Sequence, residues 1–333
     1  MTHSTVRNRS LRRGAARSTL LALVLALALP VASRAGGDTL FKLSDPRGDD
    51  HGDGSLVYPL SSDFSRGDLD LLAFSARAGD GGTWFEATFA RPVRVPGRQA
   101  IDDLGTSLTS VARYGFYTLN IDVYIDTDRV PGSGGVMALP GRKVRIAPDS
   151  AWDRAIVLTP RPHAARGELK RLLMKSLEEE MDRDDPDLEL AQAVEMRHRI
   201  PMDVEQRVFF PTLVRVQGQR ISFFVPDTFL GGPARADWSY VVAVSGANLL
   251  QSFGLAAGVG LAATEPDTLM ILPVLAGRSE SAFGGRDRPA YEPPLVDILV
   301  PQGVSQEEVL GSFDSRKKTL AEVPGVVPGG GSK

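Results

Sequence analysis

The chain has no cysteine and only four histidines among its 333 residues. The lack of cysteine excludes disulfides, thiol catalysis, iron–sulfur clusters and zinc–thiolate sites. A domain of this composition must therefore be held together by its hydrophobic core or by a metal ion. At this length, one large core is sufficient.

Motifs of common enzyme classes are also missing. The sequence contains no HExxH, no GxSxG and no P-loop. The run "GVGLAA" at Gly258–Ala263 has the weak GxGxxA spacing, but it lies in a small-residue loop rather than in a βαβ unit. A glycosidase needs only two carboxylates, and no pair stands out among the 41 acidic residues. We therefore expect a protein that is not an enzyme.

Only one apolar run is long, and it lies near the N-terminus. Leu20–Val31 is followed by Ser33-Arg34-Ala35 and is too short for a comfortable membrane span. The pattern predicts a signal peptide over residues 1–35, cleaved after Ala35, with an uncleaved anchor as the alternative. Arg12-Arg13 leaves open whether export is general secretory or twin-arginine. The positive residues before the run are Arg7, Arg9, Arg12, Arg13 and Arg17.

Removal of this segment changes the charge of the chain. The whole sequence has 38 basic and 41 acidic residues, a formal charge of −3. The first 35 residues carry six arginines and no acid, so 32 basic and 41 acidic residues remain, a formal charge of −9. This charge disfavours nucleic acids and anionic membranes as partners. It suits a periplasmic or secreted protein that binds cations or neutral ligands.

The part after the signal peptide has the pattern of β-strands. In "YTLNIDVYIDTD", apolar residues from Leu119 to Ile125 alternate with polar ones from Asn120 to Asp126, which predicts a strand with one buried and one polar face. Similar alternation occurs at Thr83–Ala90 and Arg220–Pro226, and turn residues separate these runs. The fold class we expect is all-β, an antiparallel β-sandwich.

One charged segment, residues 167–199, departs from this pattern. Its apolar residues fall on one helical stripe, and Asp184-Asp185-Pro186 ends the first helix. We predict an inserted helical pair, either a solvated excursion or a docking element for a protein partner. The expected domains are the signal peptide, a sandwich over 36–302 and a partly disordered tail over 303–333. The stripe consists of Leu169, Leu172, Leu173, Leu177 and Met181.

The most unusual run is "DPRGDDHGDG", Asp45–Gly54. Pro46 and three glycines prevent a helix, and no residue in the run is apolar. Asp45, Asp49 and Asp50 are the obvious oxygen donors for a hard cation such as Ca²⁺. The spacing is not that of an EF-hand, and a solvated turn with Asx caps explains it equally well.

This run and its surroundings resemble a known family. Asp45–Gly54 fits D-P-x-G-D-D-x-G-x-G, Tyr58-Pro59 follows, and Phe64–Asp70 fits Phe-x-x-G-x-Φ-D, where Φ is apolar. Later blocks, among them "IDVYIDTD", "ISFFVPDTFLG" and "LVDILVP", occur in the family's order up to Pro301. The chain thus resembles the glucodextranase C-terminal domain family, whose members are DOMON-like β-sandwiches similar to family 9 carbohydrate-binding modules. Asp53 departs from the pattern, since a proline is usual there.

The resemblance implies a sandwich with structural calcium at the N-terminal acidic loop. Asp45, Asp49 and Asp50 would be ligands, and Asp68 and Asp70 would complete the shell from the next strand. In the family this domain is usually attached to a starch- or dextran-type glycosidase. The alternative for Asp68 and Asp70 is strand capping and solvation.

Carbohydrate binding would need an aromatic platform with polar neighbours. Trp84 and Glu86, together with Asn120, Asp122 and Tyr124, lie on non-core faces by alternation. They would form such a surface if their strands are neighbours. The alternative for Trp84 is burial beneath a loop or the inserted helices.

The sequence as a whole predicts an exported, non-catalytic module that binds carbohydrate or cell-envelope glycan and has calcium as a structural cofactor. One alternative is a haem-binding or redox DOMON-type module, with His51, Met137 and Met270 as axial candidates. Another is an envelope assembly or structural protein that docks through the helical insertion.

Overall fold

A computed structural model of the chain describes residues 37–96, 112–181, 186–248, 269–287 and 289–330. The predicted signal peptide and the "GVGLAA" run lie outside the described residues. Residues 36–333 form one unit. Among the described helices, none combines the length and the apolar character needed to cross a membrane.

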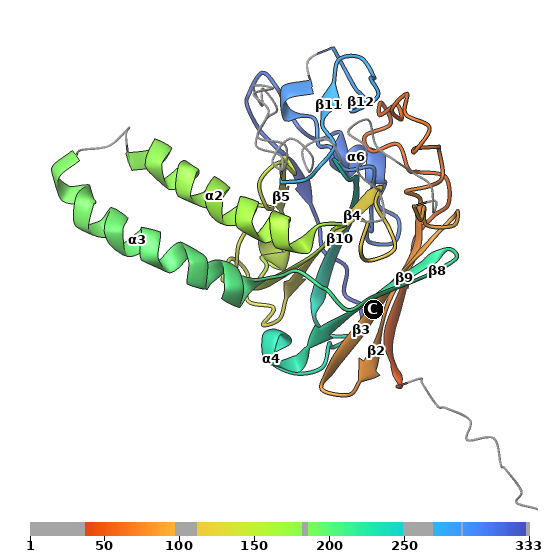
Figure 1. The fold of residues 1–333 in the computed structure, drawn as a ribbon, viewed down its shortest axis with the longest axis horizontal. Helices are drawn as coiled ribbons and strands as arrows, with labels where there is room; N and C mark the ends of the chain where they lie inside the picture. Colours follow the sequence, from red (N-terminus) through yellow and green to blue (C-terminus); the bar gives the residue numbers. More distant parts are fainter. Residues whose placement is uncertain (1–36, 97–111, 182–185, 249–268, 288, 331–333) are drawn as a thin grey trace, which may run out of the picture. The chain divides into compact units, whose positions relative to one another are not determined.

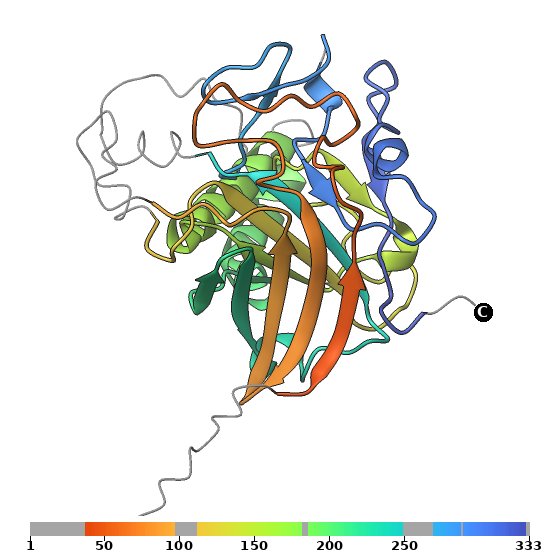
Figure 2. The same ribbon diagram turned by 90° about the vertical axis from the view of Figure 1, so that its right-hand side faces the viewer.

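Two five-stranded sheets make up the body of this unit (Figures 1 and 2). All pairs in the first sheet are antiparallel. In spatial order its strands are β1 (Thr39–Ser44), β2 (Leu71–Gly79), β3 (Gly82–Phe89), β9 (Arg220–Pro226) and β8 (Val214–Gln217).

The second sheet is antiparallel except for its β6–β7 pair. In spatial order its strands are β13 (Asp297–Ile298), β10 (Ser239–Gly246), β4 (Leu119–Asp126), β6 (Arg154–Leu158) and β7 (Val208–Phe209). Two small parallel pairs join β11 (Val274–Leu275) to β12 (Phe283–Gly284) and β14 (Ala321–Val323) to β5 (Val144–Ile146).

The main core lies between the two sheets. Phe85 of β3 stacks on Phe74 of β2 and on Phe223 of β9, with ring centroids 5.6 and 5.7 Å apart. Ile121 and Val123 of β4 belong to the same cluster. Because the period-two pattern places these residues on one face of each strand, burying both faces together gives a sandwich. The predicted fold class is confirmed.

A second core covers the other face of the second sheet. There Tyr124 of β4 and Val241 of β10 pack with Leu169 and Leu172, which come from a helix. As a result all eight residues of β4 are buried. The polar face of this strand was expected to lie outside the core, which is wrong, because helices and loops cover it.

The helical insertion is longer than the sequence predicted. It consists of α2 (Pro162–Met181) and α3 (Pro186–Arg207), which lie side by side in Figure 1. Pro162 and Pro186 each open a helix, where a missing backbone N–H costs nothing. Pro201 lies inside α3, so the helix continues past the expected end at Arg199.

The C-terminal residues also differ from the expected tail. Beyond Gln302 the chain forms α6 (Gln306–Leu310) and β14. Val326 exchanges two backbone hydrogen bonds with Tyr240 of β10, at 2.8 and 2.9 Å. Residues 303–330 are thus part of the fold. The remaining short helices are α4 (Asp227–Leu230), η1 (Pro148–Ser150) and η2 (Pro289–Tyr291).

Candidate functional site

The acidic loop runs from the end of β1 and is anchored to the segment around β13. Gly52 has a φ of +60°, and its N–H donates to Val296 O at 2.9 Å. A Cβ at this position would lie 2.4 Å from a Leu56 methyl carbon and 2.8 Å from Leu295 O. Only glycine combines this φ with so close a backbone approach. The loop is therefore held against β13.

Gln306 of α6 reinforces this attachment. Its side-chain amide donates to Asp49 O at 2.5 Å, and its carbonyl oxygen accepts from Ile298 N at 2.6 Å. One buried side chain thus links the loop backbone to β13. The sequence did not single out Gln306, because the contact joins residues 257 positions apart.

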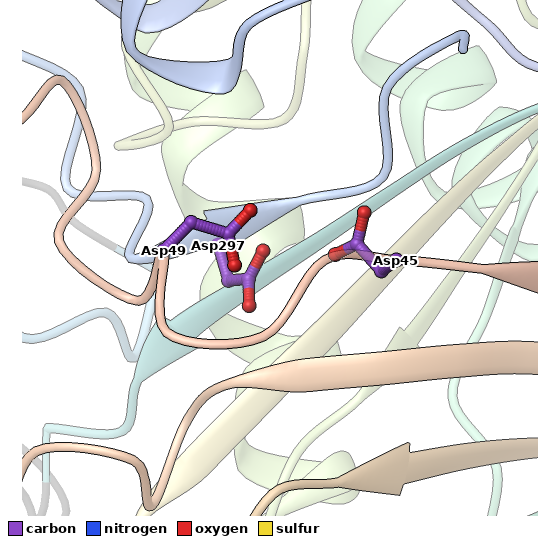
Figure 3. A group of neighbouring side chains, drawn as sticks. All are labelled: Asp45, Asp49 and Asp297. Carbon is purple, nitrogen blue, oxygen red and sulfur yellow. The ribbon is translucent and has the colours of Figure 1, made fainter.

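The two segments bring three carboxylates together. Each of Asp45, Asp49 and Asp297 offers one oxygen, and these oxygens all lie within 4.8 Å of one another (Figure 3). Asp297 lies on β13, opposite Val244 of β10, and its side chain is completely buried. Its Oδ2 accepts from Leu71 N at 2.6 Å. The site therefore combines the start of the domain with β13, the last strand in chain order of the two five-stranded sheets.

Several oxygens of this cluster have no hydrogen-bond partner among the described residues. With all three groups ionised, both carboxylate oxygens of Asp45, Oδ1 of Asp49 and Oδ1 of Asp297 are buried and unsatisfied; a protonated Asp297 would donate a hydrogen bond to Asp45. A buried carboxylate oxygen without a donor is costly, and buried charges are normally paired or coordinated to a metal. The donor set, three carboxylates with free oxygens, fits a hard cation such as Ca²⁺.

Burial and mutual repulsion also raise the pKa values here. Burial raises the pKa of Asp45 to about 8, and the charge of Asp49 adds to this effect. The pKa of Asp297 is raised well above its ordinary value by burial and then by Asp45 and Asp49. Burial likewise raises the pKa of Asp49. Without a counterion, ionising these groups opposes folding.

The other three predicted metal ligands have different partners. Asp50 Oδ2 accepts from Tyr58 Oη and Gly67 N, both at 2.5 Å. Asp68 Oδ2 accepts from Arg94 Nε at 2.8 Å, and Asp70 Oδ2 accepts from Gly48 N at 2.8 Å. Oδ1 of Asp50 and of Asp70 remains buried and unsatisfied. Asp45 and Asp49 thus join the three-carboxylate cluster, whereas Asp50, Asp68 and Asp70 lie outside it.

The predicted sugar-binding residues are not brought together. Trp84 and Glu86 lie on β3 in the first sheet, and the other three lie on β4 in the second sheet. Trp84 is 9% exposed, with the guanidinium of Arg215 4.2 Å from its ring centroid. Glu86 Oε2 accepts from Ser222 Oγ at 2.8 Å. The condition for a shared sugar-binding surface, that these strands be neighbours, is therefore not met.

The β4 residues satisfy an internal network instead. Asp122 forms two hydrogen bonds, of 2.6 and 2.9 Å, with the fully buried Arg142. Tyr124 Oη accepts from Leu139 N at 3.1 Å, and the side-chain amide of Asn120 donates to Gly246 O at 3.2 Å. Asn120, Asp122 and Tyr124 are at most 2% exposed, so they are not available to a sugar on the surface.

The haem-ligand candidates have no shared site in the described contacts. His51 Nε2 lies 2.7 Å from Glu307 Oε1. Met137 is 52% exposed, whereas Met270 is buried at 2%. Nothing in these placements favours axial ligation.

A known protein family matches most of this chain. The family described as the C-terminal binding module, SLH-like, of glucodextranase matches residues 40–325. The chain belongs to this family. None of the curated proteins matches it. The match continues beyond Gln302, where we expected the sandwich to end, and includes α6 and β14. The family is that of a binding module, not of a catalytic domain.

This glucodextranase-type module carries a polar groove at the base of the insertion. The groove has a volume of about 680 Å³ and receives residues from β6, α2, α3, β7 and α4. The rings of Phe209 and Phe229 contact each other within it, with centroids 5.2 Å apart. Its polar side chains are Arg154, Arg166, Glu205, Gln206, Arg207 and Thr228.

A second hollow of about 800 Å³ lies beside Asp45. Its side chains are mainly aliphatic or proline, among them Leu43, Val304 and Pro328. Among the described residues that line it, none is aromatic and few have polar side chains. Of these two hollows, the groove at the insertion has both aromatic and polar side chains. This mixture is expected for a ligand that has hydroxyl groups and apolar faces.

Proposed function

We propose that this chain is an exported, non-catalytic module that binds carbohydrate, with calcium as a structural cofactor. Membership of a family named as a binding module of glucodextranase supports the carbohydrate ligand. Both that family and the signal-peptide pattern of residues 1–35 support an extracellular or cell-surface location. N-terminal sequencing of exported protein should begin near Gly36, and an intact Arg12-Arg13 segment would contradict export with cleavage.

The groove at the base of the insertion is the proposed glycan site, and its mixture of aromatic and polar side chains is the observation that carries this proposal. Sugars present apolar faces, which pack on aromatic rings, and hydroxyl groups, which need donors and acceptors. Phe209 and Phe229 supply rings, while Gln206 and Thr228 supply both donors and acceptors. The site differs entirely from the five residues that alternation had suggested.

A glycan array followed by calorimetric titration tests this site. We expect the mature protein to bind a subset of glycans, and Phe229→Ala to weaken that binding at least tenfold. An anchoring aromatic side chain contributes about 1.4 kcal/mol or more to binding. Val304→Ala, in the other hollow, should bind like the wild type. Equal binding by Phe229→Ala and the wild type would contradict the assignment of the groove.

For the calcium, we propose Asp45, Asp49 and Asp297 as the carboxylate ligands. Their unsatisfied, buried oxygens and raised pKa values support the proposal. A bound cation would supply the positive charge that these three side chains lack. It would also join the N-terminal loop to β13, which makes its role structural rather than chemical.

A further inference from the structure

A second acidic group lies at the end of β4. Asp126 is the last residue of that strand, Asp128 lies in the turn that follows, and Asp153 directly precedes β6. Each offers a carboxylate oxygen, and these oxygens lie within 4.8 Å of one another. Three like charges at such a distance repel one another unless a cation lies among them.

This group is separate from the cluster around Asp45. Asp126 pairs with Ser239 at the start of β10, whereas Asp297 pairs with Val244 of the same strand. Five residues along a strand correspond to about 17 Å. Substitutions in the two groups should therefore act independently.

The environment of Asp126 supports a cation site independently of the clustering of the three carboxylates. Its side chain is only 1% exposed. Oδ1 accepts from Arg129 N at 2.7 Å, but Oδ2 is buried and has no partner within the described ranges. A buried, unsatisfied carboxylate oxygen inside a carboxylate cluster is a position that a cation would satisfy. Burial, together with Asp153 and Asp128, raises the pKa of this carboxyl.

The neighbouring hydrogen bonds hold the carboxylates in place. Asp153 Oδ2 accepts from Thr127 N and Thr127 Oγ1, at 2.8 and 2.7 Å. Asp128 Oδ1 accepts from Val130 N at 2.8 Å. These donors are neutral, in contrast to Arg94 and Arg142, which pair with Asp68 and Asp122. The side chains are thus positioned by the turn. Within the described residues none of the three forms a salt bridge, although the charge of Arg129 lowers the pKa of the Asp126 carboxyl.

We propose that Asp126, Asp128 and Asp153 form a second binding site for a divalent cation, with Ca²⁺ as the best fit. Oxygen ligands from carboxylates match its preference, and Asp128 is exposed, so water can complete a shell of six to eight oxygens. The ion would fasten the turn after β4 to the start of β6. This site is separate from the Asp45 cluster, and it adjoins the glycan groove, because Arg154 and Arg207 of the groove donate to Asp153 O.

Calorimetric titration of the full chain with CaCl₂ tests this second site. The wild type should bind two equivalents. Asp49→Asn should bind one, and the double variant Asp49→Asn/Asp128→Asn should bind none. Asp80→Asn, a substitution of an exposed aspartate in the turn between β2 and β3, should bind as the wild type does. An asparagine at position 128 keeps an oxygen that can accept from Val130 N, so this variant should fold, which circular dichroism checks.

Two results would overturn the second site. One is a folded Asp128→Asn protein that binds as many equivalents of Ca²⁺ as the wild type. The other is a folded Asp49→Asn protein that binds no Ca²⁺. If only the Asp45 cluster fails to bind, the wild type should bind one equivalent, Asp49→Asn should keep it, and Asp128→Asn should lose it.

Discussion

Asp297 is the residue that completes the acidic site, and local spacing could not predict it. Asp45 and Asp49 were evident because they share a short loop that has no apolar residue. Asp297 stands alone in "LVDILVP", about 250 positions further along the chain. A single carboxylate in an otherwise apolar strand is itself a signal, because a buried charge needs a partner. Which partner it meets depends on the pairing of β13 with β10 and on the position of the opening loop.

The variant Asp297→Asn should distinguish the effect of carboxylate repulsion on stability from the effect of cation binding. In EDTA, Asp297→Asn should melt at the same temperature as the wild type or higher, because repulsion with Asp45 and Asp49 is relieved. Added Ca²⁺ should raise the melting temperature of the wild type much more than that of the variant. Thermal melts followed by circular dichroism measure both effects. Asp80→Asn is the control and should respond like the wild type, and a full Ca²⁺ response by Asp297→Asn would exclude this residue as a ligand.

The raised pKa values predict how stability depends on pH. Because the pKa of Asp45 is about 8 in the folded state and near 3.8 when unfolded, the folded state binds more protons between these values. In EDTA, the free energy of unfolding should therefore fall as the pH rises from about 4 to 8. Saturating Ca²⁺ keeps the carboxylates ionised, so the fall should be smaller. Melts in EDTA and in Ca²⁺ across this range measure the difference, and parallel curves would contradict the prediction.

At the scale of elements, the sequence predicted which strand residues pack between the sheets, but it did not predict which segments cover the other face of β4. The alternation in β3, β4 and β9 identified the residues that pack between the sheets, and these are buried. The same alternation placed the polar face of β4 outside the core, which is wrong because a second core covers it. Periodicity describes one strand, whereas the cover comes from α2, α3 and loops distant in sequence. Asp122 tolerates burial because Arg142 pairs with it, and the side-chain amide of Asn120 donates to the backbone carbonyls of Gly246 and Met270.

The base of the helical insertion should therefore contribute to stability. Leu169 of α2 is completely buried in the second core. We expect Leu169→Ala to lower the free energy of unfolding by about 2–5 kcal/mol, the usual cost of a leucine-sized cavity. Urea denaturation measures this change.

Met202→Ala is the matched control for the insertion, since Met202 of α3 is 57% exposed. It should change stability by no more than about 0.5 kcal/mol. If Leu169→Ala were equally mild, the helices would be a solvated excursion that the sandwich does not need.

At the scale of the whole molecule, residues from both ends of the described chain meet. Asp45 and Asp49 follow the first strand, whereas Asp297, α6 and β14 lie in the last part of the described chain. The sequence predicted the sandwich and the acidic loop, but it ended the domain at Gln302. Gly- and Pro-rich composition suggested a disordered tail, yet β14 pairs with β5 and Val326 pairs with Tyr240. Composition could not reveal these pairings, because they depend on distant partners.

A cation at the Asp45 cluster would therefore stabilise the fold as a unit, by joining the N-terminal loop to β13. The most direct test compares melting temperatures in EDTA, Ca²⁺ and Mg²⁺ by scanning calorimetry. The Asp128→Asn protein is the best sample, since its response reports the Asp45 cluster alone. At a hundredfold excess over Kd, binding to the folded state adds about 2.7 kcal/mol, which corresponds to roughly 4 °C for a domain of about 300 residues. We predict a rise of this order in Ca²⁺ and a much smaller one in Mg²⁺, which requires a tighter octahedral shell. The same melting temperature in EDTA and in saturating Ca²⁺ would contradict the claim and identify the loop as a turn that needs no ion.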